Sequence, residues 1–396
     1  MKIGIDCRSI LNPEKGEAGG VGHYVYQLVR HLLQIDKKNK YVLFFDQKIK
    51  DKKLKKFSQE NVKIIFHPFY LYSKFVPTQF STRLYDAAIE KENLDVFHLP
   101  RLSNVPRRIK VRSVLTVHDL SVLRLPKIFS EKEINNEKNK LSLALSFVDR
   151  VITVSKSTQK DLFELFDFLP EKVDVIYHGL DERFLKRKTE KEIEEVKKKY
   201  NIKNNYLLFL SPLENRKNIC RIVQAFDLLK EEINKDPQKF SSVLGKNKNI
   251  QLVLAGKPGS AQNKIKNKIG ISSHKDNIIL ANYVQPDNLG ALFAGAKVFV
   301  FPSLYEGFGL PIIEAMSANI PVITSNLSSM PEIAGQGNAV FVDPYQVTEI
   351  SQALINLLSQ PALREKIVAN YQSKIKEYNW RKTAEKTLAV YKELGN

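Results

Sequence analysis

The stretch Glu306-Gly-Phe-Gly-Leu-Pro-Ile-Ile-Glu314 places two carboxylates on either side of a glycine-bearing turn. The residues before it, 297–301, form an apolar run of strand length that Pro302 ends. After the turn, Pro311 suits the first turn of a helix, because the N–H that proline lacks has no partner within the helix there. The stretch therefore predicts a strand, a tight turn and a helix in succession, which is the repeating unit of a parallel α/β sheet.

The same stretch has a composition that suits a ligand with two kinds of polar group. A turn that leads into a helix presents backbone N–H groups, which bind anions such as phosphate. The carboxylates of Glu306 and Glu314 would repel phosphate but accept hydrogen bonds from hydroxyls. A nucleotide sugar carries both groups. The alternative is an acidic loop without a ligand, in which the helix dipole favours the glutamates.

Short apolar runs recur along the whole chain and are separated by segments with helical periodicity, for example Val25, Leu28, Val29, Leu32 and Leu33. Short buried strands that alternate with helices indicate parallel sheets covered on both faces. We therefore expect an α/β fold of two Rossmann-like, doubly wound domains facing across a cleft. The expected strands are residues 2–6, 41–45, 63–66, 96–98, 113–118, 150–154 and 173–177, then 206–210, 251–255, 278–280, 297–301, 321–324 and 339–342.

The two series of strands set the expected domain boundaries. The first domain is predicted to span residues 1–183 and the second residues 203–378. Residues 182–204 are charged and poor in apolar side chains, so they are the best candidate for a linker. A chain of 396 residues is long enough for two domains, each with its own core.

The composition indicates a soluble enzyme of a reducing compartment. Two cysteines, Cys7 and Cys220, are too few for a disulfide framework and lack the spacing of metal ligands. No apolar run reaches the ~18 residues that a membrane-spanning helix needs. The first residues already read as a strand, which leaves no room for a signal peptide. We expect a cytoplasmic protein.

The net charge of +19 is spread over both halves of the chain. A nucleic-acid-binding protein would concentrate basic residues with aromatic ones on one face, so we expect no nucleic-acid partner. A lysine-rich composition by itself also explains the charge. Two local clusters exceed the general excess and could hold the protein on an anionic membrane, namely six lysines within residues 48–56 and the group Arg101, Arg107, Arg108, Lys110 and Arg112.

Six short motifs follow one another along the chain: Gly19-Gly-Val-Gly-His-Tyr24, Leu115-Thr-Val-His-Asp119, Val151-Ile-Thr-Val-Ser-Lys-Ser157, Val175-Ile-Tyr-His-Gly179, Glu214-Asn-Arg-Lys-Asn218 and Glu306–Glu314. In this order they resemble the motifs of the family-4 retaining glycosyltransferases, which have the two-domain GT-B fold, and in particular those of bacterial mannosyltransferases of group 1. The chain departs from many members at Ser211-Pro212, where they carry another arginine.

The resemblance implies an acceptor domain at the N-terminus, a donor domain after it, and a C-terminal helix, residues 379–396, that packs back on the first domain. His118 would lie near the transferred sugar, and Glu306 would contact its hydroxyls. Arg216 and Lys217 are two cations at an expected helix start, which suits a diphosphate leaving group, although a solvated basic turn is the alternative. The expected donor-binding residues are Gly19, Gly20, Gly256, Tyr283, Val284, Phe308, Gly309, Leu310 and Glu314.

The expected reaction is transfer of a hexosyl group, with retention, from GDP-mannose or a UDP-sugar to a glycan or lipid-linked acceptor. We expect no metal and no other cofactor. A dinucleotide-binding enzyme is disfavoured because Gly20-Val-Gly22 is not followed by the third glycine of that fingerprint. A nucleotide-sugar epimerase of similar fold and a catalytically inactive relative that binds nucleotide sugars stay open.

Overall fold

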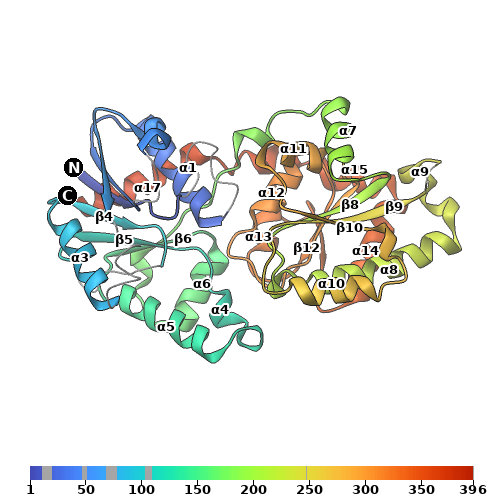
Figure 1. Cartoon of the computed structure of the whole chain (residues 1–396), viewed down its shortest axis with the longest axis horizontal. Coiled ribbons are helices and arrows are strands. Elements are labelled where there is room, and N and C mark those ends of the chain that lie inside the picture. Colours follow the sequence, from blue (N-terminus) through green and yellow to red (C-terminus); the bar gives the residue numbers. More distant parts are fainter. Residues whose placement is uncertain (11–19, 47–50, 68–77, 103–108, 247, 396) are drawn as a thin grey trace. The chain divides into compact units, whose positions relative to one another are not determined.

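A computed structural model of the chain describes residues 1–10, 20–46, 51–67, 78–102, 109–246 and 248–395. Two compact units make up the fold (Figure 1). The first consists of Met1–Gly179 together with Asn379–Asn396, and the second of Leu180–Tyr378. Each unit is a parallel sheet with helices around it, so the predicted α/β class with two doubly wound domains is confirmed.

The first unit contains a sheet of seven described strands, all parallel, in the order β3-β2-β1-β4-β5-β6-β7. The chain begins in the middle of this sheet, winds out to β3 and returns to β4 beside β1. The strand order therefore reverses between β1 and β4. The strands are β1 Lys2–Asp6, β2 Lys40–Asp46, β3 Val62–His67, β4 Val96–Leu99, β5 Arg112–Val117, β6 Arg150–Thr153 and β7 Val173–Val175.

Helices cover both faces of this sheet because side chains alternate along each strand. In β2, Leu43 and Phe45 pack into the core beneath α1, whereas Val42 and Phe44 pack with α3, α5 and α6 on the other face. Ser130 and Glu133 form a capping box that starts α5. The helices of this unit are α1 Gly20–Ile35, α3 Thr78–Glu90, α4 Ser121–Arg124, α5 Glu131–Leu145, α6 Lys156–Leu165 and α17 Trp380–Gly395.

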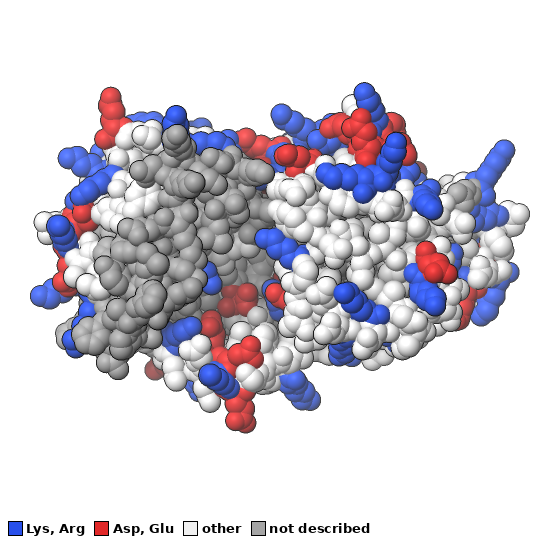
Figure 2. All heavy atoms as spheres, viewed as in Figure 1, with Lys and Arg blue, Asp and Glu red and all other residues white. Residues whose placement is uncertain are grey.

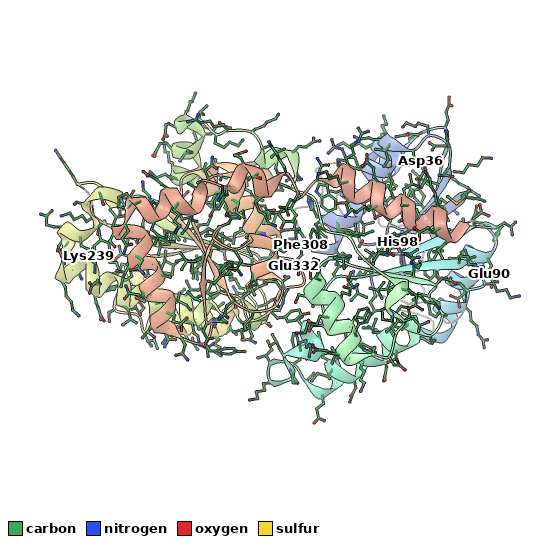
Figure 3. The ribbon with its side chains drawn as sticks, turned by 180° about the vertical axis from the view of Figure 1, so that it is seen from behind. Asp36, Glu90, His98, Lys239, Phe308 and Glu332 are labelled. Atoms are coloured by element: carbon green, nitrogen blue, oxygen red, sulfur yellow. The ribbon has the colours of Figure 1, made fainter. Side chains whose placement is uncertain are left out.

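The last helix, α17, closes the first unit. It packs against α1 and over β4 and β5, and Trp380 and Leu388 enter the core there. A buried polar chain through His98, which is labelled in Figure 3, fixes this packing. The Tyr391 hydroxyl lies 2.6 Å from Nδ1 of His98, and Nε2 of His98 lies 2.8 Å from Oγ1 of Thr116. The C-terminal segment is thus part of the core of a unit that is otherwise built from the N-terminal half of the sequence.

The second unit contains six described strands, all parallel, in the order β10-β9-β8-β11-β12-β13. They are β8 Asn205–Leu210, β9 Ile250–Ala255, β10 Ile278–Asn282, β11 Val298–Phe301, β12 Val322–Ser325 and β13 Val340–Val342. Its helices are α7 Glu190–Lys199, α8 Ile219–Lys235, α9 Ser241–Leu244, α10 Gln262–Gly270, α11 Pro286–Ala294, α12 Leu310–Ser317, α13 Met330–Ala334, α14 Val347–Ser359, α15 Pro361–Val368 and α16 Tyr371–Ile375.

The segment expected to link the domains is instead folded into the second unit, so the predicted linker at 182–204 is wrong. Helix α7 begins at a capping box of Thr189 and Glu192. It buries Ile193 and Val196, which lie three residues apart on one helix face, and packs against α11. The charged residues of the segment occupy the other faces of α7. Because most of the segment is charged, its composition did not indicate that Ile193 and Val196 are buried.

Charged side chains of both signs are scattered over the face of the molecule shown in Figure 2, in agreement with a diffuse positive charge. Lys55, Lys56, Arg101, Lys110 and Arg112 are exposed. The remaining residues of the two basic clusters lie outside the described parts, either wholly or in their side chains. Within the described parts, no helix combines the length and the apolar character needed to cross a membrane.

Candidate functional site

The candidate site lies where the strand order of the second unit reverses, between β8 and β11. In open parallel sheets, ligands bind beyond the carboxyl ends of the strands at such a point. The turn after β8 is the short helix Asn215–Lys217, and the loop after β11 spans residues 302–309. The two are joined directly, because the backbone N–H of Leu304 donates to the carbonyl of Arg216 at 2.8 Å.

Asn218 fixes the turn that carries the two cations. Its backbone is left-handed (φ 62°), a conformation that asparagine tolerates better than most residues. Its side-chain amide donates to the carbonyls of Pro302 at 3.0 Å and Pro344 at 2.6 Å. The turn after β8 is thereby tied to the segments that follow β11 and β13. This holds Arg216 and Lys217 in place just before α8.

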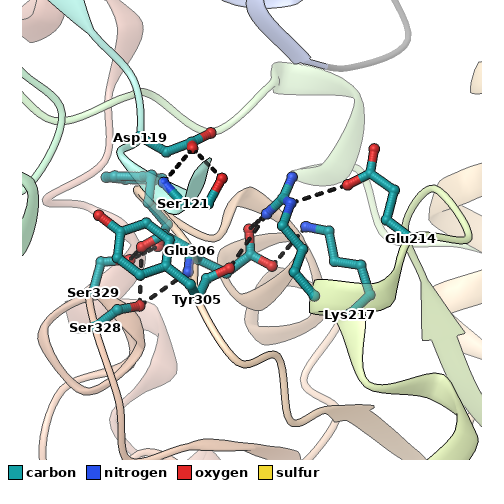
Figure 4. A network of polar contacts seen from close by, with 10 residues as sticks. Asp119, Ser121, Glu214, Lys217, Tyr305, Glu306, Ser328 and Ser329 are labelled. Atoms are coloured by element: carbon teal, nitrogen blue, oxygen red, sulfur yellow. Dashed lines mark hydrogen bonds and ion pairs between the residues drawn. The ribbon is translucent and has the colours of Figure 1, made fainter. Parts of the chain in front are cut away.

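The predicted catalytic residues of this unit form one ion-paired cluster (Figure 4). The Lys217 ammonium lies 2.6 Å from Oε1 of Glu306, and Nη1 of Arg216 lies 3.2 Å from Oε2. Arg216 also donates through Nε to Glu214 at 3.0 Å and through Nη1 to the Tyr305 carbonyl at 3.3 Å. Lys217 and Glu306 are only 4% and 7% exposed, so this pairing is needed to offset the loss of hydration.

The charges of the cluster depend on one another. Burial would raise the pKa of Glu306, but Lys217 and Arg216 outweigh burial and hold that pKa below its ordinary value. Burial lowers the pKa of Lys217, and the attraction of Glu306 opposes this shift. Glu306 is therefore an anion held between two cations. A diphosphate placed here would share those cations with it.

Gly309 starts α12 in the left-handed region, with φ 102°, which an L-residue with a side chain adopts only with strain. Pro311 lies in the first turn of the helix, as predicted. The Phe308 ring is buried and packs edge-on against Tyr378, with ring centroids 5.6 Å apart. The expected roles of Phe308, Gly309 and Leu310 thus concern their backbone.

Glu314 lies in the second turn of α12 and is partly exposed. Burial raises its pKa to about 8, the charge of Arg183 opposes this shift, and the charge of Asp181 adds to it. Arg183 is itself held by Asp181, to which Nη2 donates at 2.7 Å. At neutral pH Glu314 is therefore largely protonated, in contrast to Glu306.

Three of the expected donor-binding residues, Gly256, Tyr283 and Val284, have different surroundings. Gly256 follows β9, and a Cβ at this position would lie 1.7 Å from the Ser211 carbonyl oxygen, so glycine is required there by packing. Val284 is buried. Tyr283 is 38% exposed and carries the Lys257 ammonium 5.1 Å from its ring centroid. Of the three predicted residues, Tyr283 presents a side-chain surface.

His118 and Gly20 belong to the first unit, and Gly19 lies outside the described residues. The Nε2 atom of His118 lies 2.9 Å from the Pro100 carbonyl, which can only accept, so Nε2 carries the proton. Burial lowers the pKa of His118 to about 4, and the ring packs edge-on against Tyr24. His118 is thus a neutral imidazole whose Nδ1 is a hydrogen-bond acceptor. Gly20 begins α1 with a positive φ of 68° and is exposed.

Comparison with known proteins identifies the family. The model of the group 1 glycosyl transferases matches residues 190–374, and that of glycosyltransferase family 4 matches residues 18–184. The chain belongs to these glycosyltransferases. It is 29% identical over 300 residues to O-antigen chain mannosyltransferase B of Escherichia coli, an alignment that covers 76% of this chain and 74% of the relative.

Solved structures show the same fold. Sucrose-phosphate synthase from Thermosynechococcus elongatus superposes with a TM-score of 0.75 at 19% identity and covers 99% of this glycosyltransferase and 98% of its own chain. Anabaena HepE in complex with UDP and glucose gives a TM-score of 0.73 at 16% identity, with 99% and 100% covered. At these identities the likeness concerns the fold alone.

Sequence reasoning missed three residues that build the site of this glycosyltransferase. Glu214 belongs to a quoted motif, but nothing in the sequence indicated that it pairs with Arg216. Ser328 and Ser329 bond to the backbone of the loop after β11. Two serines before Met330-Pro331 read as the start of a helix. Their partners are about twenty residues away, and only the adjacent positions of β11 and β12 in the sheet reveal the contact.

Proposed function

We propose that this glycosyltransferase moves a hexosyl group, with retention, from a nucleotide diphosphate sugar to a glycan or lipid-linked acceptor in cell-surface polysaccharide or lipopolysaccharide synthesis. The observation that carries this proposal is the buried cluster of Glu306, Lys217 and Arg216 beside the start of α12, at the reversal point of a parallel sheet. The name of the relative, O-antigen chain mannosyltransferase B, supports a mannosyl group. GDP-mannose is therefore our first choice of donor, and a UDP-sugar the second.

In the proposed reaction, the two cations act on the leaving group. When the sugar–phosphate bond breaks, negative charge develops on the diphosphate, and Lys217 and Arg216 stabilise that charge without a metal ion. The Glu306 carboxylate accepts a hydrogen bond from a sugar hydroxyl. The departing phosphate oxygen takes the proton of the acceptor hydroxyl as the new bond forms on the same face of the sugar. For His118 we propose that Nδ1 accepts a hydrogen bond from the transferred sugar.

Glu314 is proposed to bind the ribose. An ionised carboxylate can accept from both ribose hydroxyls, whereas a protonated one has a hydrogen to donate and less capacity to accept. Binding of the nucleotide would therefore remove the proton that burial retains on Glu314.

The test is thermal stabilisation by a panel of nucleoside diphosphates and their sugars, in buffer with EDTA and again with Mg²⁺. A ligand that binds the folded state raises its stability by RT ln(1 + [L]/Kd). We expect a selective shift with guanine or uracil compounds that does not need Mg²⁺ and is reduced by Glu314→Ala. Absence of any shift would overturn the donor site. If the protein binds a nucleotide sugar but releases no nucleotide when acceptor glycans are present, the result would favour a catalytically inactive relative that binds nucleotide sugars.

Stereochemistry and location need separate tests. Retention predicts that the anomeric centre of the product, measured through its proton by NMR, keeps the configuration of the donor.

We also propose that the protein works at the cytoplasmic face of a membrane, where exposed basic residues such as Lys55, Lys56 and Arg101 contact anionic lipid. Sedimentation with vesicles that contain phosphatidylglycerol, but not with pure phosphatidylcholine, is the expected result.

A further inference from the structure

Two adjacent serines, the partly buried Ser328 and the fully buried Ser329, hold the backbone of the loop that carries Glu306 (Figure 4). The Ser329 hydroxyl lies 2.8 Å from the Glu306 carbonyl oxygen and 2.9 Å from that of Phe308, so its single proton serves one or both of them. The Ser328 hydroxyl accepts from the N–H of Glu306 at 3.0 Å and lies 3.0 Å from the Glu306 carbonyl. The residue that pairs with Lys217 is thus held at both of its backbone polar groups.

These bonds also determine where the next amides point. In a trans peptide the C=O of one residue and the N–H of the following residue point in opposite directions, and no described peptide bond is cis. Since the Phe308 carbonyl faces Ser329, the N–H of Gly309 faces away from the serines. Gly309 immediately precedes α12, so this amide adds to the N–H groups at the start of that helix.

The backbone conformation of Ser328 indicates that these contacts serve a function. Its φ of 49° lies in the left-handed region, where glycine or asparagine is favoured and serine is strained. Of the described non-glycine residues with positive φ, the other five are all asparagines. Strain of this kind persists only where the surrounding structure requires it, and here the side chain contributes two contacts to the Glu306 backbone.

We propose that Ser328 and Ser329 are positioning residues that hold Glu306 between its cations and direct the Gly309 amide toward the diphosphate of the donor. This inference rests on the proposed function, because it assumes that the loop binds a nucleotide diphosphate. The serines themselves touch no substrate. They act through the loop, which they hold from the side of β12 and α13.

The decisive variant is Ser328→Gly. Glycine removes both hydroxyl contacts but adopts a φ of 49° without strain. The variant should therefore fold and be at least as stable toward heat as the parent. We expect affinity for the nucleoside diphosphate to fall about tenfold, the loss that follows when one charge-assisted hydrogen bond is no longer aligned. Affinity for the nucleoside without phosphates should be unchanged, because the loop is proposed to act on the phosphates.

Asn319→Gly is the matched control, since it relieves a similar left-handed residue (φ 56°) at the end of α12 without touching the loop. It should bind the diphosphate like the parent. A second variant, Ser329→Ala, should also weaken binding of the diphosphate more than that of the nucleoside. If Ser328→Gly binds the diphosphate as tightly as the parent, the positioning role is overturned while the donor site stands. If the parent protein binds no nucleoside diphosphate, both proposals are overturned.

Discussion

At the scale of single residues, Glu306 and Glu314 are two carboxylates of one motif with opposite environments. Glu306 is buried between Lys217 and Arg216, and these cations keep it ionised. Glu314 is not ion-paired among the described residues, and burial keeps its proton up to about pH 8. The same residue type thus supplies an anion in the loop after β11 and a titratable group in the second turn of α12. Each environment leads to a prediction that can be measured.

Lys217→Met should destabilise the protein by about 3 kcal/mol, because a buried carboxylate then loses its nearest cation. The cost is at the lower end for a broken buried pair, since Arg216 still contacts Glu306. Unfolding in urea measures it. Lys230→Met is the control: Lys230 is equally buried and on α8, has no ion pair within the described residues, and should change stability little.

A double variant separates stability from binding. Lys217→Met combined with Glu306→Gln removes the uncompensated charge, so most of the lost stability should return. Affinity for the nucleoside diphosphate should stay low, because one phosphate-binding cation is still missing. If the double variant were no more stable than Lys217→Met, the buried charge would not be the cause of the loss.

The affinity for an intact nucleotide sugar should rise with pH up to about 8. The folded protein holds a proton on Glu314 below this value, and binding to the ribose hydroxyls requires its removal. Well below pH 8, the affinity therefore increases by up to about tenfold per pH unit, and it levels off above. Calorimetric titrations between pH 6 and 8.5 measure the slope. The Glu314→Gln variant should show none, and an equally flat profile in the parent would contradict a ribose-binding carboxylate.

The residues of the candidate site differ in how far the sequence alone predicts them. Glu306, Lys217 and Arg216 stand in motifs that local spacing makes recognisable, and the structure brings them into contact. Their direct pairing was not predicted, because charges far apart in sequence reveal no distances. Gly256 was expected to bind the donor, but a close backbone approach by Ser211 already explains this glycine.

At the scale of elements, strands were easier to predict than the segments between them. Each expected strand is present within one or two residues, because a buried parallel strand is a continuous apolar run. Helix α7 was missed because only Ile193 and Val196 reveal its buried face. The packing of α17 followed from the family resemblance alone, since no local pattern says which core a terminal helix will join.

The anchoring of α17 gives a prediction at this scale. Tyr391→Phe removes the hydroxyl that faces Nδ1 of His98 and leaves this buried nitrogen without its partner. We expect a loss of about 1–3 kcal/mol in the stability of the first unit. Tyr345→Phe, at a half-exposed tyrosine of the second unit, should have no effect. Equal melting temperatures for Tyr391→Phe and the parent would show that the polar chain through His98 does not hold the helix.

At the scale of the whole molecule, buried histidines should make the stability of the first unit depend on pH. Among the described residues of the first unit, burial lowers the pKa of His98 to about 3, that of His118 to about 4, and that of His178 well below its ordinary value. His118 and His178 pack close to Tyr24, and His178 lies near Trp380. Trp380 is the only tryptophan of the chain, so its fluorescence reports on this unit alone.

The stability of the first unit should therefore fall as the pH drops from about 6.5 to 5. Well above pH 6.5 these histidines are neutral in both states and contribute nothing to the pH dependence. Below it, the unfolded chain binds protons that the folded unit does not accept, and each histidine lowers the stability by up to about 1.4 kcal/mol per pH unit. Buried carboxylates such as Asp6, whose pKa is lowered, lose their contribution only at lower pH. Urea unfolding, monitored by Trp380 fluorescence, should show this decrease in stability with falling pH. In the His98→Gln variant, the decrease per pH unit should be smaller by the contribution of one proton. A midpoint that does not change between pH 5 and 7 would mean that these rings take up protons in the folded unit as readily as in the unfolded chain.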